Sequence, residues 1–178
     1  MAAGVGVAEV AGDLVDELRQ ELLRSGGVVP GVVEGRSMVP FLQPGDRVLA
    51  GPPDEVRPGD LVVFRRDGRW IVHRVLEARG DLLLEGGDRV GPTGLLPADQ
   101  VIGRVVAVRR GGRELKLGSP VVRSTKRLLA WLTLVHAAAR PGVGTGRRFR
   151  PVPRVVARAV ISLLGRAAWA LGAHGTGR

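Results

Sequence analysis

The sequence contains no cysteine and no tyrosine, and its 178 residues include only three Trp and three Phe. Without cysteine, disulfides, thiolate nucleophiles and cysteine-ligated zinc sites are excluded. Because aromatic side chains are scarce, Val, Leu and Ala must fill the core. Lysine is rare too, since Lys116 and Lys126 are the only two among 27 basic residues. Arginine stays protonated at ordinary pH, so few side chains remain that can act as a base.

Long apolar runs are missing as well. No stretch of about 18 uncharged apolar residues occurs, and residues 155–173, which come closest, contain Arg158 and Arg166. The N-terminus lacks the basic start and apolar run of a secretory signal peptide, because acidic residues beginning with Glu9 interrupt it. We therefore expect a cytoplasmic or peripheral membrane protein with no signal peptide and no clear transmembrane helix.

Acidic residues are absent from the last third of the chain. Residues 1–118 hold 16 Lys/Arg and 17 Asp/Glu, whereas residues 119–178 hold 11 Lys/Arg and no acid. The net charge of +10 therefore belongs to the C-terminal third, and the change in composition marks a boundary near Ser119.

The tail contains two apolar segments, residues 126–139 and 155–171, that we expect to be helices and that could pair as a hairpin. A basic, apolar tail suits an anionic partner, either a membrane surface or nucleic acid. Few aromatic side chains are present for base stacking, which makes nucleic acid the less favoured partner. Packing of these helices against the rest of the protein is the alternative.

The remaining pattern changes from helical to β near residue 28. Leu14, Leu18 and Leu22 recur at helical spacing, and Gly26-Gly27 ends that segment. After it, short runs rich in Val and Leu alternate with turn signals, which predicts a compact antiparallel β domain in which residues 86–97 form a loop. We therefore expect three domains: an N-terminal amphipathic helix at 1–27, a β domain at 28–118 and a basic, acid-free helical tail at 119–178.

The segment from Gly35 to Asp46 offers a candidate nucleophile, Ser37, in a turn rich in Gly and Pro. A serine hydroxyl becomes nucleophilic when a neighbouring base takes its proton. His73, in the sequence Trp-Ile-Val-His-Arg-Val, is the candidate base. A serine in such a turn is most often a turn residue only, and a lone histidine in an apolar strand is most often a core residue. Both assignments therefore depend on the wider pattern.

The wider pattern is an ordered series of motifs. Gly-x-Ser-Met-x-Pro is followed by Pro-Gly-Asp-x-Val, Pro-Gly-Asp-Leu-Val-Val-Phe, Ile-Val-His-Arg-Val and Leu-Leu-Glu-Gly-Gly-Asp. This series resembles the signal peptidase family of serine endopeptidases, in the S24–S26 group, and more distantly the self-cleaving repressors that share its fold. The resemblance covers residues 35–108. It implies a mainly β protein with an antiparallel peptidase domain, which here is flanked by an N-terminal helix and two C-terminal helices.

The resemblance also implies roles for individual residues. Ser37 takes the position of the nucleophile. His73 stands where the common bacterial enzymes have lysine, as in the Ser/His version found in archaea and the endoplasmic reticulum. In the enzymes of that version, acidic residues follow the histidine. Asp88 matches the first of these acids and is the expected third catalytic residue. The second acidic pair of that version is missing, and Asp99 is a less favoured substitute for Asp88. No metal or cofactor is implied.

These observations predict a signal-peptidase-like serine endopeptidase that acts on a leader or signal peptide. Such enzymes normally have a membrane anchor before the serine motif, where this chain has an acidic amphipathic helix, so a relative acting on cytosolic peptides is also consistent. A self-processing regulator that cuts its own Ala11–Gly12 bond is one alternative. A non-catalytic protein that binds a membrane or nucleic acid through its basic tail is another. The oligomeric state is not predicted.

Overall fold

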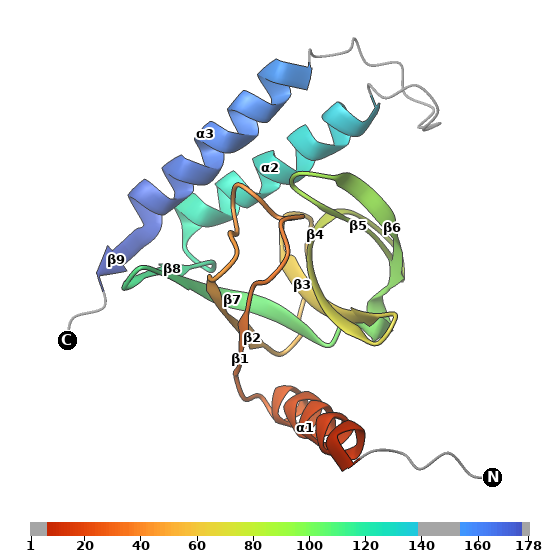
Figure 1. Ribbon diagram of the computed structural model, residues 1–178. Helices are drawn as coiled ribbons and strands as arrows, with labels where there is room; N and C mark the ends of the chain where they lie inside the picture. The colour runs from red at the N-terminus through yellow and green to blue at the C-terminus, as the bar shows by residue number, and fades with distance from the viewer. Residues whose placement is uncertain (1–6, 139–153, 176–178) are drawn as a thin grey trace.

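The computed structural model describes residues 7–138 and 154–175 (Figure 1). A helix, a run of strands and two further helices follow one another along the chain, which confirms the expected mainly β, antiparallel fold. The elements are α1 (Val7–Arg24), β1 (Val29–Val32), β2 (Arg47–Gly51), β3 (Leu61–Arg66), β4 (Arg69–Arg79), β5 (Leu82–Gly87), β6 (Gly91–Pro97), the 3₁₀ turn η1 (Ala98–Gln100), β7 (Gly103–Arg110), β8 (Arg113–Lys116), α2 (Pro120–Ala138), α3 (Arg154–Gly172) and β9 (Ala173–Gly175).

The strands within the described ranges form one antiparallel sheet in the order β1-β2-β7-β3-β4-β5-β6, with β8 on β7 and β9 on β8. Asp67 and Gly68 have positive φ and close the β3–β4 hairpin with the backbone that a two-residue turn needs. Residues 91–97, expected to be loop, are strand β6 instead. Their prolines fit because β6 ends the main path of the sheet and pairs on one side only.

The main hydrophobic core joins the sheet to all three helices. Strand residues pack there with Leu23 of α1 and with the apolar face of the turn after β1, and α2 and α3 complete the cluster. The helical contributions from the tail are Val122, Leu129, Ala168 and Trp169. A second, smaller cluster fills the space between β3, β4, β5 and β6. The helices are therefore part of the packing that supports the sheet.

Helices α2 and α3 lie side by side across one end of the curled sheet, with α1 at the other end (Figure 1). Polar contacts bind the tail to the β part: Lys126 donates to Asp60 at 2.7 Å, and the Trp169 indole donates to the Phe41 carbonyl at 3.1 Å. The expected hairpin of helices is thus present and packs on the β part. The boundary expected at Ser119 precedes α2, while the division into three domains stays a prediction. No helix in the described ranges is long and apolar enough to cross a membrane.

Candidate active site

Ser37 lies in the turn that follows β1, at a half-buried position. The Met38 carbonyl accepts a hydrogen bond from the Leu42 N–H at 2.9 Å, and the Ser37 carbonyl accepts one from the Arg89 N–H at 2.8 Å. Gly87 approaches the same Ser37 carbonyl so closely that a Cβ atom at this position would lie 2.5 Å from it. The buried Met38 side chain and the β5–β6 connection therefore fix where the serine stands.

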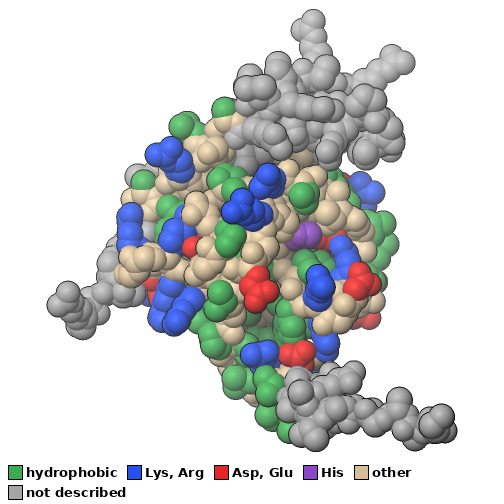
Figure 2. All heavy atoms as spheres, in the orientation of Figure 1, with side chains coloured by type: hydrophobic (Ala, Val, Ile, Leu, Met, Phe, Trp, Pro, Cys, Tyr) green, Lys and Arg blue, Asp and Glu red, His purple; other side chains and the backbone are tan. Residues whose placement is uncertain are grey.

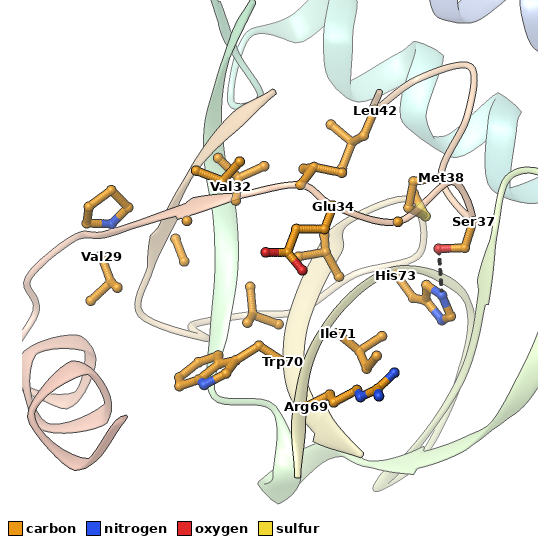
Figure 3. A pocket seen from close by; sticks show the side chains of 18 of the residues that line it. Val29, Val32, Glu34, Ser37, Met38, Leu42, Arg69, Trp70, Ile71 and His73 are labelled. Atoms are coloured by element: carbon orange, nitrogen blue, oxygen red, sulfur yellow. Dashed lines mark hydrogen bonds between the residues drawn. The ribbon is translucent and has the colours of Figure 1, made fainter. Parts of the chain in front are cut away.

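His73 comes from β4, whose backbone pairs with β3, and its side chain is buried. Its Nε2 atom lies 3.1 Å from the Ser37 Oγ atom, the contact drawn as a dashed line in Figure 3. The ring of Phe64 meets the imidazole edge to face at a centroid distance of 6.1 Å. The two residues that the sequence singled out are thus within hydrogen-bond distance of each other.

Glu85 is the carboxylate beside His73. Its Oε2 atom lies 2.5 Å from His73 Nδ1, and the Thr93 hydroxyl and the Arg66 guanidinium each donate to it, at 2.8 and 2.9 Å from Oε1. Burial by itself would raise the pKa of this carboxyl, whose side chain is fully buried. The hydrogen bonds from these three side chains, His73 first, outweigh burial and hold the pKa of Glu85 below its ordinary value.

The position of the proton on the His73 ring follows from the hydrogen bonds that the ring makes. An ionised carboxylate only accepts hydrogen bonds, so the short contact with Glu85 requires a proton on His73 Nδ1. The lone pair on Nε2 then faces the Ser37 hydroxyl and can accept its proton. A serine hydroxyl, a neutral imidazole and a buried carboxylate in this order form the arrangement that activates a serine for attack on a carbonyl carbon.

The structure places Asp88 and Asp99 away from His73. Both oxygens of Asp88 accept hydrogen bonds from the Arg74 guanidinium, at 2.7 and 2.8 Å, and neither side chain is exposed. Arg74 also donates to the Gly59 carbonyl and lies over the Phe41 ring. Asp99 is an exposed residue of η1. The carboxylate that contacts His73 is therefore Glu85, while Asp88 pairs with a buried arginine.

Sequence reasoning missed Glu85, Thr93 and Arg66. One signal for Glu85 was available, because it is an acid within the otherwise apolar run Leu82 to Gly87, and acids are rarely buried without a partner. Thr93 and Arg66 carry no such signal, since a threonine in a turn-rich segment and an arginine at a strand end are common.

A cleft of about 790 Å³ runs from Ser37 and His73 towards α1. Its two walls are the segment from Val29 to Gly35, which contains β1, and the first residues of β4, Arg69 to His73. Figure 3 shows Glu34 on the first wall and Trp70 on the second, and Figure 2 shows hydrophobic side chains gathered over the lower part of the same face. The floor consists mainly of apolar side chains: Leu23, Met38, Leu42, Val48, Ala50 and Val63.

Both walls of the cleft present strand edges that no described strand occupies. β1 ends the sheet and pairs only with β2. The pairing of β4 with β5 begins at Arg74, so the residues before it pair with β3 alone. The cleft can therefore receive an extended peptide whose backbone pairs with one edge or both. In the part of the chain that the structure describes, no cluster of His, Asp and Glu forms a candidate metal site.

Comparison with known proteins gives one family. The model of a family described as Peptidase S24-like matches residues 2–106, which include Ser37, His73 and Glu85. The match ends before α2. No curated protein matches the chain.

Proposed function

Because the chain belongs to the S24-like peptidase family, we propose that it is a serine endopeptidase whose nucleophile is Ser37 and whose base is His73, with Glu85 as the third residue. The observation that carries this proposal is the continuous contact from the Ser37 Oγ atom through the imidazole to a buried carboxylate. Each group is held by fixed backbone or side-chain partners, so the arrangement is organised before any substrate arrives.

The proposed reaction begins when His73 Nε2 takes the Ser37 proton as Oγ attacks the scissile carbonyl carbon. Glu85 stabilises the positive imidazolium that forms. Among the described residues, none accepts a hydrogen bond from the Ser37 N–H, which leaves this group available to stabilise the oxyanion. The imidazolium then gives its proton to the leaving amine, and the peptide C–N bond breaks. Water, deprotonated by the same imidazole, hydrolyses the acyl-enzyme and restores Ser37.

The cleft supports an extended peptide as the substrate, with apolar side chains directed to its floor. A signal-peptidase-like enzyme of the Ser/His version that cleaves a leader or signal peptide is consistent with such a cleft. Self-cleavage at Ala11–Gly12 fits less well. That bond lies within helix α1, and this helix lies away from Ser37 (Figures 1 and 3).

The test is cleavage of an extended peptide library by the full chain and by Ser37→Ala and His73→Ala variants. We expect each substitution to lower kcat/KM by about 10⁴-fold or more, because the groups act as a unit. Ser124→Ala, at an exposed position of α2, is the matched control and should leave kcat/KM unchanged. Full activity of His73→Ala would contradict the proposal. Mass spectrometry of the protein incubated alone separates the self-processing alternative, which requires the loss of residues 1–11.

A further inference from the structure

Glu34 places a negative charge on the wall of the cleft. Its side chain is exposed, and Figure 3 shows its carboxylate directed towards the gap between the two walls. Among the described residues, no basic side chain pairs with it, whereas Arg19 at the far end of the cleft pairs with Asp16 at 3.1 Å. The proposed reaction gives the Glu34 charge no role. The carboxylate is therefore available to a side chain of the peptide in the cleft.

The segment that carries Glu34 continues strand β1 in an extended form. The Val33 N–H donates to the Asp46 carbonyl at 2.9 Å, and the Val33 carbonyl accepts from the Gly45 N–H at 2.8 Å. Val33 packs against the core, while the residues on either side of it are exposed, so side chains alternate here as they do along a strand. The backbone groups of Glu34 therefore face the other edge, where none of the described residues bonds them.

A peptide strand that pairs with this edge brings one of its side chains next to the Glu34 carboxylate. Side chains directly opposite each other in a strand pair lie on the same face, with Cβ atoms about 4.5–5.5 Å apart. An opposite charge stabilises such a pair, and a like charge destabilises it. The peptide residues on either side point to the other face, as Val33 does, and meet the apolar floor of the cleft.

We propose that Glu34 selects substrates with a lysine or arginine between two apolar residues, close to the scissile bond. Glu34 precedes Ser37 by three residues, so at about 3.3 Å per residue their Cα atoms lie at most about 10 Å apart. A paired peptide strand covers that length with about three residues. The basic residue therefore lies within about three residues of the bond that is cut. This inference rests on the proposed function, since the cleft must hold the substrate.

The first measurement is peptide binding to the full chain with Ser37→Ala, which removes the nucleophile. The probes are fluorescein-labelled peptides of about twelve residues, built from Ala, Val and Thr with one central Lys, Gln or Glu. We expect the Lys peptide to bind about three- to tenfold more tightly than the Glu peptide, with the Gln peptide between them. The ratio should approach one at high salt, because ions screen exposed charges. Adding Glu34→Lys should reverse the order.

Asp54→Lys is the matched control, because it makes the same change of charge at an exposed turn outside the cleft. It should leave the ratio of Lys to Glu binding unchanged, which separates a local contact from the net charge of the protein. No measurable binding of any peptide, a ratio of one, or a ratio that Asp54→Lys changes as much as Glu34→Lys overturns the inference. A preference for the Glu peptide that Arg69→Gln removes also overturns it and assigns the selectivity to the second wall.

The second measurement uses the chain with Ser37 intact and locates the cleaved bond by mass spectrometry. In these nearly uniform peptides the single Lys sets the register, so the cleaved bond should move with the Lys when its position is shifted. A cleavage position that does not follow the Lys contradicts the inference while it supports the proposed function. Charge-selective binding without cleavage of any peptide has the opposite meaning. It supports Glu34 as the residue that selects the peptide and contradicts the endopeptidase.

Discussion

Glu85 and Asp88 are buried carboxylates three residues apart, and they contact different basic side chains. Glu85 contacts His73, whereas Asp88 forms a two-point ion pair with the next residue, Arg74. The register of β4 and β5 explains the division. Arg74 lies opposite Gly86, and side chains alternate between the two faces of a sheet. The histidine and Glu85 therefore share one face, while the arginine and the chain leading to Asp88 share the other.

The adjacent residues His73 and Arg74 thus contact two separate acids, of which Glu85 serves the proposed chemistry and Asp88 supports the fold. The Arg74–Asp88 pair holds the β5–β6 connection, whose Arg89 N–H binds the Ser37 carbonyl. Asp88 thus supports the Ser37 turn through the backbone, and Glu85 contacts His73 directly. Four measurements distinguish these two roles.

The largest expected effect is on catalysis by Glu85→Gln. The amide cannot stabilise the imidazolium and no longer fixes the proton on Nδ1, so we expect kcat to fall about 10³–10⁴-fold with a small change in KM. The change is measured by steady-state cleavage of the best library peptide. A kcat within tenfold of the unaltered enzyme would remove Glu85 from the proposed catalytic group.

Asp88→Asn should act mainly on stability. It leaves the fully buried Arg74 guanidinium without a counter-charge, which costs about 3–5 kcal/mol of the free energy of unfolding. Urea denaturation measures the loss, with Asp81→Asn as the exposed control for which we expect almost no change. If the folded Asp88→Asn protein loses as much kcat as Glu85→Gln while keeping its stability, the two roles are assigned the wrong way round.

Acid should weaken the contribution of Glu85 to stability. The pKa of Glu85 is lowered in the folded protein, so its charged form adds stability above the ordinary value of 4.5 and this contribution is lost as the pH falls through the folded value. The difference in unfolding free energy between the unaltered protein and Glu85→Gln should therefore shrink as the pH drops below about 4.5. A difference that stays constant down to pH 3 would contradict the lowered pKa.

The smallest effect is expected from Thr93→Val, which keeps the side-chain volume and removes the hydroxyl that donates to Glu85. One hydrogen bond to a carboxylate contributes about 1.5–3 kcal/mol at most, and the two stronger donors remain. We expect a kcat three- to tenfold lower, roughly 0.7–1.4 kcal/mol in the barrier. The pH at which kcat is half-maximal should move as well, which a purely structural role would not cause.

The sequence was sufficient to predict the helices, most strands, and the contact between Ser37 and His73. It did not predict that Glu85 contacts His73, because this contact depends on a single irregularity in the pairing of β4 with β5. From the turn onwards β4 and β5 pair as Arg79 with Leu82, and a regular continuation would place His73 opposite Asp88. The pairing shifts by one residue between Val75 and Glu77, and a shift of one residue turns every later side chain to the other face.

The position of the tail was not predictable for a different reason. An apolar, basic helix satisfies the same pattern whether it packs on a sheet or lies on another surface. The deciding contacts are long-range pairs such as Lys126 with Asp60 and Trp169 with the Phe41 carbonyl. The sequence around these residues contains no local pattern that indicates either contact.

The Trp169 and Lys126 contacts have an evolutionary consequence. The family match ends at residue 106, so a recombination event that moved only the matched part would carry Asp60 without Lys126 and the Phe41 carbonyl without its indole donor. The segment that contains both partners of each contact is therefore longer than the segment that the family match covers. Substitutions around Phe41 and along α3 should be inherited together.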